Sequence, residues 1–140
     1  MKVLNLTGRE IRVVVDGKVL LQARPSGQTA QVWRSWEKVA PFCPHYEDGD
    51  CSAVAGVVGE CKDPCPYGMG VPVKCLSVRI EGLPEPCDGT VYLVSPSVLT
   101  ALRQLGLRRP DVYCPDPATT VESTEGVFIV RELLSGAGLP

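Results

Sequence analysis

Apolar and polar positions alternate over several short stretches of the chain, which is the pattern of β-strands with one buried face. Residues 10–21, EIRVVVDGKVLL, contain two runs of β-branched and aliphatic residues around Asp16-Gly17, a dipeptide that accepts the positive φ angles of a tight turn. This stretch therefore predicts a β-hairpin. Because residues 2–6 precede it and residues 29–36 follow it with similar patterns, we expect an N-terminal antiparallel sheet.

The second half of the chain contains further predicted strands. Their apolar runs lie at residues 71–80, 90–94 and 126–133. Residues 82–86, GLPEP, have the composition of a turn, and residues 111–117 show no regular period. We expect this last segment to be irregular.

One helix is predicted at about residues 95–105. Ser95 can accept a hydrogen bond from the amides of a first helical turn, and Pro96 suits the first helical position because no donor is needed there. Gly106 can end the helix in a left-handed conformation. The apolar stripe expected to be buried consists of Val98, Leu99, Ala101, Leu102 and Leu105. One helix among many strands predicts an α+β fold, mainly antiparallel or mixed sheet.

Residues 41–70 interrupt this regular pattern. Cys, Pro, Gly and acidic residues dominate them, and only residues 53–58 have the composition of a short strand. A chain of 140 residues builds one hydrophobic core rather than two. We therefore predict a single domain over residues 1–140, with a cysteine-rich loop insertion at about residues 41–70.

The seven cysteines, five of them within residues 43–75, raise three structural explanations: a zinc site, disulfides and free structural thiols. A zinc site is considered because Cys61 and Cys65 have a C-x3-C spacing, but a second closely spaced pair is missing from the sequence. The candidate zinc ligands are Cys43, His45, Cys51, Cys61 and Cys65. Disulfides are favoured, because thermophiles use them inside cells and a bridge across about 15 residues stabilises by roughly 3 kcal/mol. The disulfide candidates are Cys43, Cys51, Cys61, Cys65 and Cys75.

No feature of the sequence indicates an enzyme. A catalytic cysteine needs a base, and His45 is the only histidine in the chain. The sequence also lacks a phosphate-binding glycine loop, a triad signature and a paired-histidine motif. We therefore expect a non-enzymatic protein with no catalytic residues, and with no cofactor unless zinc binds.

The charge distribution is uneven. Residues 1–40 hold seven Lys and Arg against three Asp and Glu, whereas residues 41–140 hold seven against thirteen. The basic part contains no continuous basic run that could follow a phosphate backbone, so direct nucleic-acid binding is not expected. The first residues lack the apolar run of a signal peptide, and no stretch has the length of a membrane span. We expect a cytoplasmic protein that does not enter a membrane.

Two groups of residues are candidates for binding a protein partner. They are Trp33, Arg34, Trp36 and Lys38 in the first group, and Arg108 and Arg109 in the second. Tryptophan and arginine are enriched at protein interfaces. A plainer interpretation puts one tryptophan in the core and leaves the other half-exposed, and cations after a helix also offset its dipole without any partner.

Three stretches carry a resemblance to a family of small bacteriophage proteins. They are KVLNLTGREIRVVVDGKVLLQARPSG, EGLPEPCDGTVYLVSPSVLTAL, and the ending from RRPDVYCPDP to GVFIVREL. The family begins with an N-L-T segment and a hairpin, passes through a G-L-P-E-P turn, and contains an R-x-D segment. It has a short link where residues 41–70 stand here, which supports an insertion. An extra Arg108 precedes the R-x-D segment.

In length, composition and cysteine content the chain also resembles regulators of Thermus bacteriophages that bind the host RNA polymerase. The resemblance implies a protein of the host cytoplasm that docks on the polymerase β-subunit flap and on σ region 4. Promoters that need a −35 contact would then be inhibited, with antitermination as a second effect. A zinc-binding structural module, or a phage accessory protein of another function, is the alternative.

Overall fold

The structure, a computed structural model, describes residues 1–42, 46–47, 50–51 and 70–138, and the two short stretches in the middle through their backbone alone. The chain divides into two compact units. The first comprises Met1–Trp33 and Val78–Pro140, and the second comprises Arg34–Ser77. Most of the predicted insertion, including the strand expected at residues 53–58, lies outside the described residues, so it stays a prediction.

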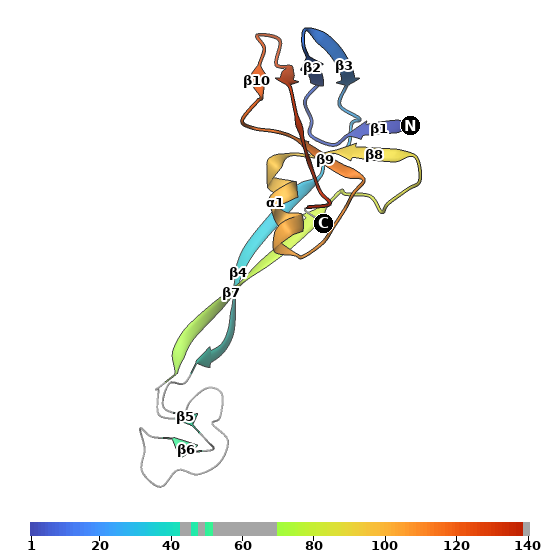
Figure 1. Ribbon diagram of the computed structural model, residues 1–140. Coiled ribbons are helices and arrows are strands. Elements are labelled where there is room, and N and C mark those ends of the chain that lie inside the picture. Colours follow the sequence, from blue (N-terminus) through green and yellow to red (C-terminus); the bar gives the residue numbers. More distant parts are fainter. Residues whose placement is uncertain (43–45, 48–49, 52–69, 139–140) are drawn as a thin grey trace. The chain divides into compact units, whose positions relative to one another are not determined.

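Strands make up most of the described regular structure, and one helix accompanies them (Figure 1). The elements of the first unit are β1 (Lys2–Asn5), β2 (Ile11–Val15), β3 (Lys18–Ala23), β8 (Thr90–Leu93), α1 (Pro96–Gln104), β9 (Val112–Pro115), β10 (Val121–Glu122), β11 (Phe128–Val130) and β12 (Leu133–Ser135). The boundary between the units crosses the two longest strands, which pair with each other, namely β4 (Gln31–Phe42) and β7 (Val71–Glu81). Within the second unit, β5 (Tyr46–Glu47) pairs with β6 (Asp50–Cys51). The predicted α+β class, mainly sheet, is confirmed.

Two four-stranded sheets make up the first unit, with strand orders β1-β8-β9-β12 and β10-β11-β2-β3. In the first sheet β1, β8 and β9 are parallel, and β12 runs antiparallel to β9. In the second sheet β2 is antiparallel to β3 and parallel to β11. The predicted N-terminal antiparallel sheet is therefore wrong beyond the β2–β3 hairpin, because β1 and β4 pair with strands far away in the sequence.

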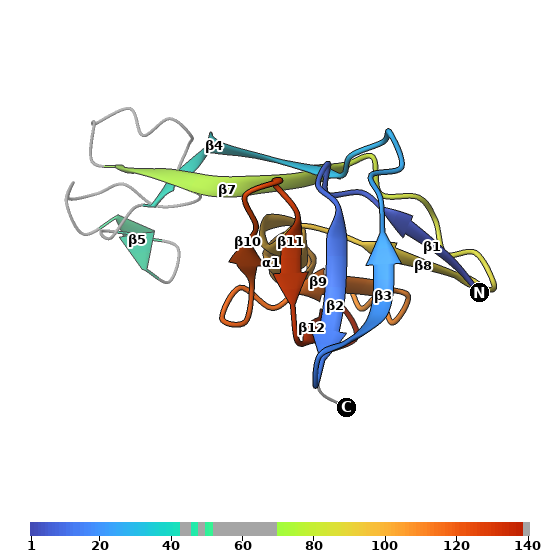
Figure 2. The ribbon, with the colours of Figure 1, turned by 90° about the horizontal axis from the view of Figure 1, so that it is seen from above.

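The first sheet lies between α1 and the second sheet. Side chains in and directly after β8 pack on both faces of the first sheet. Tyr92 and Val94 belong to a core cluster that includes Val98 of α1, whereas Leu93 belongs to a second cluster with Ile11 of β2. Successive side chains of a strand point to opposite faces, which produces this division. Figure 2 shows the second sheet with α1 behind it. Burial on both faces explains why β8 reads as a nearly continuous apolar run.

The ends of the hairpin turn and of the helix follow their local sequence. Asp16 and Gly17 both have positive φ, at 50° and 75°, as the predicted tight turn requires. At the end of α1, Gly106 has φ 68°, its amide donates to Arg103, and the Leu107 amide donates to Leu102. These two bonds form a Schellman motif, so the predicted glycine end is confirmed.

The start of α1 differs from expectation in one respect. Ser95 is the N-cap and Pro96 the first helical residue, but the Ser95 hydroxyl makes no capping hydrogen bond. The stripe of α1 is buried at Val98, Leu99, Ala101 and Leu102, whereas Leu105 is exposed because the helix has ended there. No helix among the described residues is long and apolar enough to cross a membrane.

Two segments near the end of the chain were predicted incorrectly. Residues 112–115 form β9 instead of an irregular segment, because Val112 and Cys114 are buried in the core cluster that includes residues of α1. Residues 126–133 do not form one strand. β11 ends at Val130 and β12 begins at Leu133, and β11 belongs to the second sheet whereas β12 belongs to the first.

The side chain of Asn5 holds the loop between β1 and β2. It is 1% exposed, and its Nδ2 donates to the carbonyl oxygens of Arg9 at 2.5 Å and Ala23 at 3.0 Å. Its Oδ1 accepts from the amide of Thr7 at 3.0 Å and from the Thr7 hydroxyl at 2.6 Å. The N-L-T segment therefore has a structural role, in which a buried amide is satisfied on both sides.

Candidate functional site

Exposed apolar side chains gather on the paired strands β4 and β7 of the second unit. They are Trp36, Val39, Phe42, Val71 and Leu76, each between 38% and 68% exposed. Trp36 and Phe42 share one face of β4 and Val39 lies on the other, so these five residues, which we call the ribbon surface, cover both faces of the β4–β7 pair. Exposed apolar side chains that lie together mark surfaces that bind another molecule.

β4 places basic side chains among its aromatic ones. Because side chains alternate along a strand, Arg34, Trp36, Lys38 and Phe42 share one face of β4, and Glu37 lies on the other. The structure thus brings three of the predicted partner-binding residues, Arg34, Trp36 and Lys38, onto a single face. An aromatic and cationic face suits a partner that offers apolar area with acidic groups nearby.

Trp33 belongs to the first unit and has a different environment. Its Nε1 donates to Glu81 Oε2 at 2.9 Å, and Glu81 also accepts from Arg79 at 2.8 Å. Trp33 is 52% exposed and Trp36 is 68% exposed. The plainer interpretation, in which one tryptophan lies in the core, is therefore wrong.

Arg109 is hydrogen-bonded inside the first unit. Its Nε and Nη2 donate to the two carboxylate oxygens of Asp111 at 2.9 and 2.8 Å, and Nη2 also donates to the carbonyl oxygen of Pro84 at 2.8 Å. The hydrogen bonds with Arg109 lower the pKa of Asp111, and those with Asp111 raise the pKa of Arg109. The Arg109 side chain, 15% exposed, joins the R-x-D segment to the G-L-P-E-P turn. Of the predicted basic pair, Arg108 is the exposed member.

Most of the predicted zinc and disulfide residues lie outside the described side chains. This applies to Cys43, His45, Cys51, Cys61 and Cys65, for which both assignments stay predictions. Cys75 is exposed on β7 and carries a free thiol. Its candidate disulfide partners lie outside the described side chains, so the disulfide there stays a prediction. Within the part of the chain that the structure describes, no three His, Cys, Asp or Glu side chains are grouped to hold a metal ion.

Cys87 and Cys114 have opposite environments. Cys87 is exposed, whereas Cys114 is completely buried on β9. Burial raises the pKa of the Cys114 thiol to about 11, and the nearby Asp116 carboxylate acts in the same direction. Since the thiolate is the nucleophile, Cys114 is an inert core residue.

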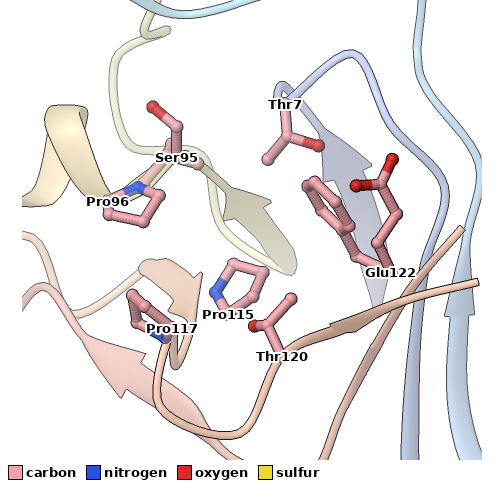
Figure 3. Close-up of a pocket in the computed structure, with 9 residues that line it drawn as sticks. Thr7, Ser95, Pro96, Pro115, Pro117, Thr120 and Glu122 are labelled. Atoms are coloured by element: carbon pink, nitrogen blue, oxygen red, sulfur yellow. The ribbon is translucent and has the colours of Figure 1, made fainter. Parts of the chain in front are cut away.

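A pocket of about 450 Å³ lies in the first unit, at one edge of the first sheet (Figure 3). β1, β8 and β9 are parallel, so their carboxyl ends meet at the same edge. The pocket is lined by residues that follow or end these strands, together with residues of β10 and β11. They are Thr7, Val94, Ser95, Pro96, Pro115, Pro117, Thr120, Glu122 and Phe128. We call it the carboxyl-end pocket.

Most polar groups on the pocket wall already have partners. The Thr120 hydroxyl donates to Asp116 O at 2.7 Å, and Glu122 forms an ion pair with Arg9. The Arg9 guanidinium also lies over the ring of Phe128, 5.0 Å from its centre. The Ser95 hydroxyl is the exception, because no described group hydrogen-bonds to it.

This pocket could not be predicted from the sequence. Its lining comes from the ends of several elements, and most of its residues are prolines and threonines, which carry no distinctive motif. The one signal in the sequence is Ser95-Pro96, since a helix start directly after a strand is where α/β folds bind ligands. Recognising it also requires the parallel pairing of β1 and β8, which the sequence pattern does not reveal.

Comparisons with protein-family models, with curated proteins and with solved structures found no match for this chain.

Proposed function

We propose that this chain is a bacteriophage-encoded, non-enzymatic regulator of transcription that binds the host RNA polymerase through the ribbon surface. The observation that carries the proposal is the exposed aromatic face of β4, where Trp36 is 68% and Phe42 is 62% exposed. Aromatic side chains beside Arg and Lys often dominate the binding energy of an interface. Docking these rings on a partner would remove their apolar area from water, which favours association.

The resemblance to regulators of Thermus bacteriophages supports RNA polymerase as the partner. In this proposal the chain contacts the β-subunit flap and σ region 4 in the host cytoplasm. Displacing region 4 inhibits promoters that depend on a −35 contact, and antitermination is a second effect. This action requires no direct contact with nucleic acid, no membrane and no metal cofactor.

Binding to purified polymerase tests the proposal directly. The chain is immobilised and exposed to core enzyme and to holoenzyme from a thermophilic bacterium, and the bound subunits are quantified. We expect micromolar or tighter binding that weakens in Trp36→Ala and is retained in Leu20→Ala. Leu20 is a matched control because it is 65% exposed on β3, outside the ribbon surface. Absence of any complex with core enzyme or holoenzyme would refute the proposal.

Transcription in vitro separates the mechanism from binding alone. We expect inhibition at a promoter that needs the −35 element and normal activity at an extended −10 promoter. Equal inhibition of both promoters would show that the chain does not act through σ region 4. If the chain binds polymerase but inhibits transcription from neither promoter, polymerase remains the partner and the proposed inhibition is excluded.

A further inference from the structure

The carboxyl-end pocket has a position that favours ligand binding, independently of the ribbon surface. In sheets with parallel strands, ligands bind beyond the carboxyl ends of the strands, where the connecting loops diverge. Three such ends converge here: β1 leads to Thr7, β8 leads to Ser95, and β9 ends at Pro115. A volume of about 450 Å³ lies within the range of small-molecule sites.

The walls of the pocket select an apolar ring. Pro96, Pro115 and Pro117 contribute apolar rings to the lining, and Figure 3 shows these labelled residues around the pocket. Phe128 adds an aromatic side chain, which is held by the Arg9 guanidinium over its ring. Aromatic rings stack on such surfaces and bury a large area for few rotatable bonds.

The charge of the lining selects a neutral ligand. Among the described residues that line the pocket, Glu122 is the only one with an ionisable side chain, and its ion pair with Arg9 compensates its charge. This lining therefore offers no unpaired charge to a ligand that carries a net charge. Charged groups that lose water without a partner bind poorly.

One hydrogen-bonding group on the wall is available to the ligand. The Ser95 hydroxyl makes no capping hydrogen bond. In Figure 3 its oxygen is turned away from Pro96 and Pro115, and rotation about the Cα–Cβ bond of this serine would bring it toward the pocket. The Thr120 hydroxyl proton is already donated to Asp116, and the Thr7 hydroxyl bonds to Asn5. An acceptor on the ligand would therefore meet Ser95.

We propose that the carboxyl-end pocket binds a small neutral molecule that contains an aromatic ring next to a hydrogen-bond acceptor. The ring lies against Phe128 and the three prolines, and the acceptor receives the Ser95 hydroxyl proton. This site lies wholly in the first unit and goes beyond the proposed contact with polymerase.

Benzamide is the first probe, because it is neutral and places a carbonyl next to a ring. Titration of the full-length ¹⁵N-labelled chain should give saturable amide shifts at Val94, Ser95 and Thr120. The dissociation constant should be on the order of 10 mM, which ligand efficiency allows for so small a molecule. Benzoate and benzylamine, which carry the same ring with a negative or positive charge, should bind several-fold more weakly.

Two substitutions at the pocket have a matched control outside it. Ser95→Ala should weaken benzamide binding about fivefold, the usual effect of one neutral hydrogen bond. Pro117→Ala, in an exposed loop and away from the helix start, should weaken it by loss of ring contact. Ser97→Ala removes the neighbouring exposed hydroxyl, which does not line the pocket, and should leave the affinity unchanged.

Several results would overturn the proposal. The absence of saturable shifts with benzamide would exclude the site, and stronger binding of benzoate or benzylamine would exclude a neutral ligand. N-acetylphenylalaninamide is a further probe, because it carries the same type of ring on a peptide unit. Binding of this compound without binding of benzamide would identify a partner's side chain as the occupant instead of a small molecule.

Discussion

Arg109 and Asp111 face each other across Pro110 through two parallel hydrogen bonds of 2.9 and 2.8 Å. The guanidinium also donates to the Pro84 carbonyl oxygen, so it connects two loops that are 25 residues apart in the sequence. Both side chains are largely buried, at 15% and 16% exposure. The planar guanidinium of Arg109 donates to Asp111 and to Pro84 at the same time. Lysine could not replace it, because an ammonium group lacks this fixed geometry of several donors.

Asp111→Asn should destabilise the folded chain. The amide keeps one acceptor oxygen and loses the charge that compensates Arg109, so we expect the free energy of unfolding to fall by about 1.5–3 kcal/mol. Urea unfolding at pH 7 measures the change. Asp88→Asn is the control, since Asp88 is exposed in the nearby turn and should stay within about 0.5 kcal/mol of the unchanged chain.

The stabilisation by Asp111 should also depend on pH. Its pKa is lowered in the folded state by the hydrogen bonds from Arg109. Its contribution is therefore fully present above the unfolded-state pKa of about 3.9, and it is lost as the pH falls through the folded-state pKa. The stability difference between the unchanged chain and Asp111→Asn should be constant from about pH 6 to 8 and shrink below about pH 4. Urea titrations at pH 3 and pH 7 measure this stability difference. An equally large difference at both pH values would contradict this assignment.

Gly82→Ala should be much more disruptive than Gly89→Ala. Both glycines have positive φ, at 82° and 75°, so both substitutions strain the backbone by about 1–2 kcal/mol. At Gly82 an added Cβ would also lie 2.3 Å from the carbonyl oxygen of Thr29, whereas at Gly89 nothing lies within 4 Å. We expect a total loss near 2–5 kcal/mol for Gly82→Ala, including the cost of the clash. Equal losses for the two variants in thermal or urea unfolding would show that the contact with Thr29 relaxes freely.

The three described cysteine thiols should differ in their reactivity. Cys75 and Cys87 are exposed, whereas Cys114 is buried with its pKa raised to about 11. At pH 8 only about one Cys114 thiol in a thousand would be ionised even if a reagent reached it. N-ethylmaleimide, followed by peptide mass spectrometry, should label Cys75 and Cys87 in the folded chain and Cys114 only in urea. Labelling of Cys114 at the rate of Cys87 without urea would contradict its burial.

Trp36→Ala and Phe42→Ala should affect binding far more than stability. Both side chains are exposed, so the free energy of unfolding should change by less than about 1 kcal/mol, the range of strand propensity. If they dock on polymerase as proposed, each substitution should raise the dissociation constant at least about tenfold. Matched calorimetric unfolding and polymerase titrations measure both quantities on the same samples. Unchanged affinity in both variants would move the contact away from the ribbon surface.

Local signals in the sequence were sufficient to predict the hairpin and the helix. Asp16-Gly17 can adopt the turn without help from the rest of the chain, and Gly106 ends α1 through bonds to the last helical turn. The α+β class follows from the same periodicities. These features depend on residues within a few positions of one another.

Strand pairing was not predictable, because it depends on contacts that are distant in the sequence. β1 precedes the β2–β3 hairpin directly and was expected to join it in an antiparallel sheet, yet Leu4 lies opposite Tyr92 in a parallel pair with β8. The register and direction of β1 depend on the burial of the first sheet on both of its faces, between α1 and the second sheet. A single sequence does not reveal that arrangement. The bond from Arg109 to Pro84 and the carboxyl-end pocket were missed for the same reason.

The pairing of β4 with β7 has a consequence for how this fold can evolve. The chain departs at Phe42 and returns at Val71 on neighbouring strands, so the two ends of the intervening segment are held near each other. Lengthening a loop between fixed ends costs little in closure entropy, about 0.6 kcal/mol for each doubling of its length. New sequence can therefore accumulate at this position without disturbing the sheets at either end of the chain, which makes it a natural place for a lineage to gain or exchange binding partners.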